Sequence, residues 1–72
     1  MAVENREFAD ATGCSPSMAS RLRNGNRLPG ADLLHRIHLA YDIPLDVLFA
    51  ARDRGAKAMG RLLRNAIFDV NP

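Results

Sequence analysis

Polar side chains between residues 16 and 24 have types and a spacing that suit hydrogen bonding to a large polar ligand. Ser17 and Arg21 are four residues apart and Asn24 follows three residues later, so all three lie on one side of a helix. An arginine guanidinium can donate two hydrogen bonds to a guanine edge, which contributes ~1–3 kcal/mol of base discrimination. We therefore expect Arg21 to read a base, Ser17 to reach several bases and Pro16 to pack on a thymine methyl group.

Charge is distributed unevenly, although the formal net charge is only +2. The segment 15–30 contains three arginines and no acidic residue, and the segment 52–64 contains four arginines and one lysine against Asp53 alone. Basic segments of this kind are attracted to nucleic-acid phosphates. For the second segment an ordinary solvated helix face is an equally good interpretation.

Two short helices must position the polar side chains. The first is expected from residue 2 or 4 to residue 12, and Gly13 ends it because glycine readily takes a positive φ. The second is expected over 16–24, with Ser15 as its N-cap and Pro16 in its first turn. This layout over 5–24 is a helix-turn-helix, which presents its second helix to the DNA major groove.

Contacts to DNA phosphates are expected around the second helix. Asn5 and Arg6 begin the first helix, where free N–H groups and the helix dipole favour an anion. Ser20 and Asn24 lie on the outer side of the second helix, and we expect phosphate contacts from both. Such contacts position a protein on DNA without reading its sequence.

The rest of the chain predicts three more helices and no strands, hence an all-α fold of about five helices. They cover 31–41, a short segment after Pro44 that Gly55 ends, and 56–68. The last helix carries an apolar stripe of Met59, Leu62, Leu63, Ala66 and Ile67. A stripe of this size needs burial, either in the core of the same chain or across a dimer axis, and the small size of the domain favours the core. No repeat or linker is evident, so 1–72 is expected to form one domain.

Residues 5–49 resemble the phage lambda repressor/Cro-type, or Xre-like, helix-turn-helix family. Phe8-Ala9 matches a large apolar residue followed by alanine, and Gly13 matches the turn glycine. Asn24-Gly25 followed by Pro29 matches the family's N/R-G-x-x-x-P loop, and LLHRIHLAYDIPLDVLF resembles its LLKIAKALGVSLDELF ending. The resemblance implies a compact DNA-binding domain in which Asn5 holds the DNA backbone and the loop residues Asn24, Asn26 and Arg27 run along the phosphates. A contact from Arg27 to a base edge is a further alternative.

Two departures from this family are linked. The family usually has a full helix before the position of Asn5, and commonly a glutamate at the position of Arg23 that pairs with an arginine of that helix. Here only 1–4 precede Asn5, and the glutamate is absent too. The added C-terminal helix over 56–68 is the candidate to cover the apolar surface that the usual first helix would bury.

Other chemistry has little support in the sequence. His35 and His38 lie three residues apart, but no third metal ligand is evident, and zinc sites usually need three or four. Cys14 has no base beside it, and as the one cysteine it cannot form an intrachain disulfide. We expect no enzyme activity, metal or cofactor. No signal peptide or transmembrane run is present, which predicts a cytoplasmic protein that acts on DNA without a membrane partner.

The sequence therefore predicts a small phage or bacterial transcriptional repressor of Cro type. It is expected to bind a palindromic double-stranded operator, with weak homodimers completed on DNA, and the chain is too short for a small-molecule effector module. Three alternatives remain open: the antitoxin of a toxin–antitoxin pair, a DNA-bending excisionase, and a helical interaction module that has lost DNA binding.

Overall fold

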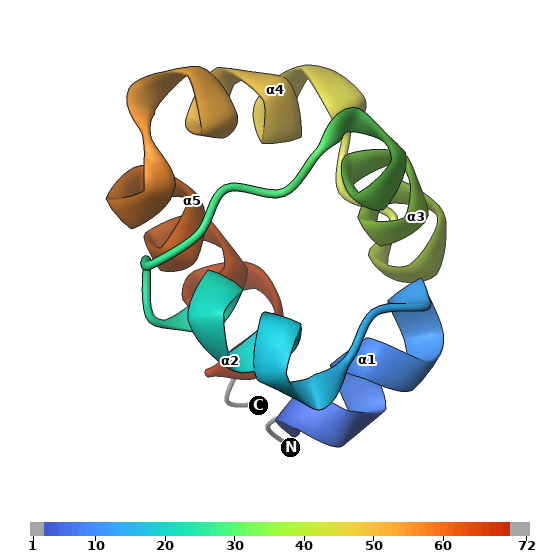
Figure 1. Ribbon diagram of the computed structural model, residues 1–72. Coiled ribbons are helices and arrows are strands. Elements are labelled where there is room, and N and C mark those ends of the chain that lie inside the picture. The colour runs from blue at the N-terminus through green and yellow to red at the C-terminus, as the bar shows by residue number, and fades with distance from the viewer. Residues whose placement is uncertain (1–2, 70–72) are drawn as a thin grey trace.

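Helices are the only regular elements in residues 3–69, the part of the chain that the computed structural model describes. In chain order they are α1 (Asn5–Thr12), α2 (Pro16–Arg23), α3 (Ala31–Tyr41), α4 (Leu45–Arg54) and α5 (Ala56–Leu63), which continues into the π-helical turn η1 (Arg64–Phe68). Figure 1 shows them arranged around a common core, with α4 at the top and α1 and α2 below. The predicted all-α fold of about five helices is confirmed. No helix of the described part is long and apolar enough to cross a membrane.

Local signals determine the angle between α1 and α2. Gly13 adopts φ 76° and ends α1, and its N–H donates to the carbonyl of Ala9. The Ser15 hydroxyl accepts a hydrogen bond of 3.0 Å from the N–H of Met18, so the predicted N-cap of α2 is present. Pro16 occupies the first turn, where no N–H is required. The helix-turn-helix geometry therefore follows from residues 13–16.

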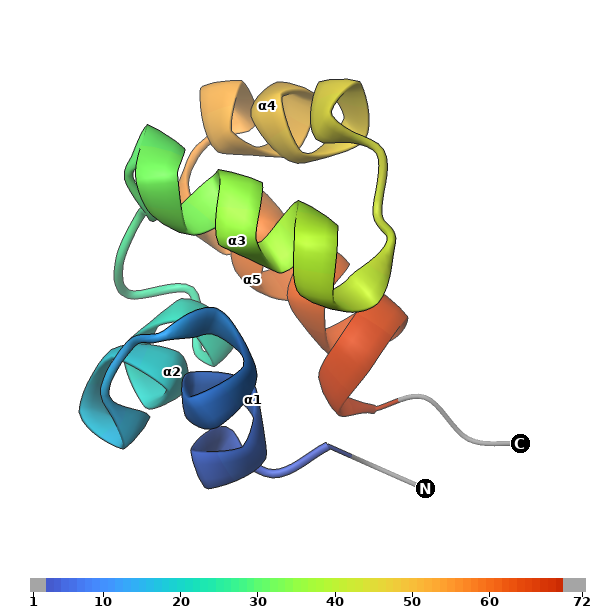
Figure 2. The ribbon, with the colours of Figure 1, turned by 90° about the vertical axis from the view of Figure 1, so that its right-hand side faces the viewer.

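The C-terminal helix packs into the core of the same chain. Met59, Leu63 and Phe68 are fully buried, and Ile67 is 2% exposed. The ring of Phe68 lies 5.0 Å from that of Phe8, centroid to centroid, so the end of the described chain contacts α1. Figure 2 shows α5 running behind α3 from α4 toward α1. The helix thereby closes the face of the core between α2 and α4, both of which it contacts.

The predicted apolar stripe is wrong at one position. Ala66 is exposed, while its neighbours Ile67 and Phe68 are both buried. The chain reaches this arrangement through η1, where the N–H of Asp69 donates to the carbonyl of Arg64, five residues back, at 2.7 Å. This wider turn brings the side chain of Phe68, and not that of Ala66, into the core beside Ile67.

Two glycines let α5 approach the end of α2. A Cβ atom on Gly60 would lie 2.8 Å from the backbone nitrogen of Gly25 and 3.1 Å from the carbonyl oxygen of Leu22. Gly25 itself has φ 75° and lies in the turn after α2. The two backbones are therefore in direct contact, and the position of α2 depends on α5.

Candidate nucleic-acid interface

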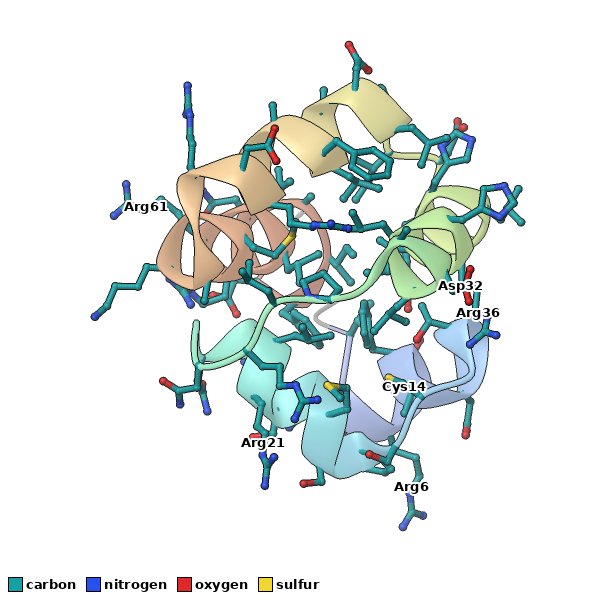
Figure 3. The ribbon with its side chains drawn as sticks, turned by 45° about the horizontal axis from the view of Figure 1, so that its top comes forward. Arg6, Cys14, Arg21, Asp32, Arg36 and Arg61 are labelled. Atoms are coloured by element: carbon teal, nitrogen blue, oxygen red, sulfur yellow. The ribbon has the colours of Figure 1, made fainter. Side chains whose placement is uncertain are left out.

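The outer face of α2 carries the residues predicted to contact bases. Pro16, Ser17 and Arg21 are exposed, whereas Ala19 and Leu22 are fully buried on the opposite side. Figure 3 shows Arg21 pointing away from the body of the protein, toward the side to which Arg6 of α1 also points. The helix thus presents an arginine and a hydroxyl on a free surface without losing its core contacts.

Met18 lies on α2 between the exposed Ser17 and the buried Ala19. It is half-buried and packs against the core cluster. Its side chain therefore anchors α2 to the protein. The surface left for a ligand consists of the smaller or charged side chains around it.

The first turn of α1 lies beside α2 and carries both free N–H groups and acidic side chains, since Glu4 and Glu7 are exposed there. Glu4, the N-cap residue, makes no hydrogen bond with its side chain to the free N–H groups of this turn. Arg6 is exposed there, and Asn5 is half-buried. The Asn5 Oδ1 accepts a long hydrogen bond of 3.5 Å from Arg23 Nη1, which holds the Asn5 side chain against α2. A phosphate at this end of the interface would meet backbone donors and the Arg6 guanidinium.

The loop after α2 provides the second flank. The N–H of Asn26 donates to the carbonyl of Arg21 at 2.9 Å, which fixes the loop to the last turn of α2. Asn26 and Arg27 are exposed, while Pro29 is buried and anchors the far side of the loop. Asn26 and Arg27 are thus free side chains on an anchored loop.

Ser20 and Asn24 are less free than their positions in the sequence suggest. Ser20 is half-buried, and its hydroxyl accepts a hydrogen bond of 3.5 Å from the amide of the exposed Asn24. The two side chains therefore form one polar unit on the last turn of α2. Of the two, Asn24 has the larger surface available to a phosphate.

Arg23 has a role that the sequence did not indicate. Its guanidinium lies 3.3 Å from the Asp69 carboxylate and 5.1 Å from the centroid of the Phe68 ring. Its carbonyl oxygen accepts a hydrogen bond from Nη1 of Arg64. Arg23 therefore joins α2 to η1, whereas Arg21 and Arg27 remain exposed. The one available signal was that Arg23 replaces the glutamate of the family pattern.

The basic segment 52–64 likewise contains both engaged and exposed side chains. Arg52 is half-buried with its guanidinium 5.5 Å from the centroid of the Phe49 ring, and Arg64 is half-buried against α2. Arg54, Lys57 and Arg61 are exposed. Figure 3 shows Arg61 pointing to a different side of the molecule from Arg6 and Arg21. The segment is therefore not one continuous basic face.

His38 and Cys14, which were considered for metal binding and thiol chemistry, contact other groups of the same chain. Nδ1 of His38 lies 2.7 Å from the carbonyl oxygen of Ile43, and the Cys14 sulfur lies 3.4 Å from the Thr12 hydroxyl. Among residues 3–69, no three histidine, cysteine, aspartate or glutamate side chains gather closely enough to hold a metal ion. These residues form contacts within the fold.

Comparison with known proteins agrees with this geometry. A family model described as helix-turn-helix matches residues 4–48, more than half of the chain. No curated protein and no solved structure matches the chain. The matched segment contains α1, α2, α3 and the first part of α4, including the whole of the interface described above. The chain therefore belongs to the lambda repressor-like, or Xre-like, helix-turn-helix family.

Proposed function

We propose that this protein is a sequence-specific transcriptional repressor of Cro type from a phage or a bacterium. One observation carries the proposal: α2 exposes Pro16, Ser17 and Arg21 on one side while Ala19 and Leu22 bury the other. A helix held in this way can enter the major groove of double-stranded DNA without any change in the core.

The expected mechanism separates base reading from positioning. Arg21 donates two hydrogen bonds to a guanine, and Ser17 and Pro16 contact neighbouring base edges. Phosphate contacts on the two flanks come from Asn5, Arg6, Ser20, Asn24, Asn26 and Arg27. These flanking contacts hold α2 in register on the duplex and make binding sensitive to salt.

A palindromic operator and a weak dimer form part of the proposal. One recognition helix contacts only a few base pairs, so two copies related by a two-fold axis are needed for a specific site. Most of the apolar stripe of the C-terminal helix lies in the core, since Met59, Leu63 and Ile67 are buried. Little of that stripe is left for a dimer, which favours weak association that DNA completes. We expect no small-molecule effector and a cytoplasmic site of action.

Selection from random double-stranded DNA tests this function. We expect the full chain to enrich a palindrome whose half-sites are about one helical turn, or 10–10.5 base pairs, apart. Affinity for the selected site should fall steeply as salt rises, since phosphate contacts release counterions. If no sequence is enriched and no specific binding appears at low salt, the repressor function is wrong.

An antitoxin is the second candidate, because α4 and α5 leave a partly apolar groove between them. That function requires a protein partner as well as DNA. An excisionase would bend its site, so a gel-mobility bend assay on the selected DNA separates it from a repressor.

A further inference from the structure

A groove between α4 and α5 has a composition that suits a protein partner. Its volume is about 370 Å³, within the range of small ligand-binding clefts, and it is open to solvent. Val47, Ala50 and Arg54 line the α4 side, and Ala58, Arg61 and Leu62 line the α5 side. Alanines on both walls leave room for an inserted apolar side chain. Val47 is 41% exposed, although it is a large apolar residue.

The two arginines of the groove have no acidic partner within the described chain. The Arg23–Asp69 pair is the one ion pair found among residues 3–69, so neither Arg54 nor Arg61 forms an ion pair there, although Asp53 adjoins Arg54 in the sequence. Both arginines are exposed. The groove therefore combines small apolar side chains with two free positive charges.

DNA is a poor occupant for this groove. Arg61 points to a different side of the molecule from Arg6 and Arg21 (Figure 3), so it does not share the face on which those two arginines would meet a duplex. A second copy of the same groove is also disfavoured. In a two-fold interface two grooves that each carry Arg54 and Arg61 would face each other, and surfaces of like charge oppose association.

We propose that this groove binds an amphipathic helix of another protein, with acidic residues beside its apolar stripe. One or two apolar side chains of that helix insert between Ala50 and Ala58, and its carboxylates pair with Arg54 and Arg61. Apolar grooves between helices bind helical segments in this manner, and charge complementarity selects the partner. Because α2 lies elsewhere, the protein can hold this partner and DNA together.

Selection from a phage-displayed library of helical peptides tests the proposal. The peptides carry a fixed leucine stripe and random flanking residues, and the bait is the intact chain without DNA. We expect enrichment of glutamate and aspartate beside the leucines. In fluorescence-anisotropy titrations, Arg54→Glu combined with Arg61→Glu should weaken the best peptide at least about tenfold.

Matched variants make the result decisive. Arg36→Glu reverses one arginine at an exposed position of α3, as each single groove variant does, and should leave peptide affinity within about twofold. Ala50→Leu narrows the groove and should also weaken the peptide, while thermal melting verifies that every variant remains folded.

Three outcomes would overturn the proposal. The first is a selection without acidic enrichment, or with peptides that bind the double variant as tightly as the original chain. The second is sedimentation showing a dimer that the double variant dissociates, since the groove would then join two copies. The third is a loss of DNA affinity in the double variant as large as that caused by Arg27→Ala, since the arginines would then contact DNA.

Discussion

The guanidinium of Arg23 lies 5.1 Å from the centroid of the Phe68 ring, so the recognition helix contacts the end of η1 directly. The same guanidinium is 3.3 Å from the Asp69 carboxylate. In the family pattern, a glutamate at this position pairs with an arginine of a preceding helix. Here the two charges are exchanged, and the acidic partner comes from the C-terminal side. The continuous helix formed by α5 and η1 thus holds α2, the recognition helix, against the core.

Truncation before Ala56 should unfold the protein. It removes the buried side chains Met59, Leu63, Ile67 and Phe68. Loss of one buried phenylalanine side chain alone costs ~3–5 kcal/mol, while a small domain has only ~5–15 kcal/mol in total. Circular dichroism should show no cooperative melting, and DNA binding should disappear. As a control, Ala66→Ser in the full chain should leave stability nearly unchanged, because Ala66 is exposed. A folded truncation that binds the operator normally would show that α5 and η1 are not needed for the core.

Gly60→Ala should destabilise the protein, although alanine normally favours a helix over glycine. The new methyl group would lie 2.8 Å from the nitrogen of Gly25, which is a backbone atom and cannot rotate away. Overpacking of this kind costs ~1–3 kcal/mol. Denaturant unfolding provides the measurement. Gly30→Ala is the comparison, since its methyl group meets nothing within 4 Å, and its only expected cost is that of alanine at the N-cap of α3. Equal effects of the two substitutions would show that α5 and α2 are not in contact at Gly60.

Arg21→Ala and Arg27→Ala should weaken DNA binding in different ways. Arg21→Ala is expected to lose ~1–3 kcal/mol on the best site and to relax preference at one base pair. Arg27→Ala should weaken all sequences about equally and reduce the dependence of affinity on salt, as expected for a phosphate contact. Affinities for the selected site and its single-base variants, each at several salt concentrations, distinguish the two. Equal, sequence-independent losses from both variants would rule out base reading by Arg21.

Stability should decline at alkaline pH through Tyr41. Burial, and then the negative charges of Glu7 and Cys14, raise the pKa of the Tyr41 hydroxyl above its ordinary value of 10.0. The folded state therefore keeps this proton to a higher pH than the unfolded state does. Its contribution to the free energy of unfolding is complete below pH 10 and is lost as pH rises through the folded pKa.

Tyr41→Phe tests this pH dependence. The variant retains a ring to stack on Phe8, whose centroid lies 5.8 Å from that of Tyr41. Urea unfolding between neutral and strongly alkaline pH should show a smaller decline for Tyr41→Phe than for the original chain. An identical decline in both proteins would assign the alkaline sensitivity to other groups.

The sequence by itself determined the helix-turn-helix and most helix limits. Gly13, Ser15 and Pro16 act on the backbone within one turn of their own positions, so their effect does not depend on distant residues. The exposure of Ser17 and Arg21 was also predictable, because Ala19 and Leu22 define the buried side of the same short helix. The family resemblance added the loop residues Asn26 and Arg27 to the expected interface.

Only the tertiary structure decided which arginines are free. Arg21 and Arg23 lie in the same acid-free segment, yet Arg23 is engaged by Asp69, which is 46 residues away in the chain. The burial of Phe68 instead of Ala66, and the groove between α4 and α5, were likewise not evident from periodicity. In each case the result depends on which distant surfaces meet and how closely their backbones approach. Local sequence patterns determine how a segment folds, but contacts between segments arise only when all the helices share one core.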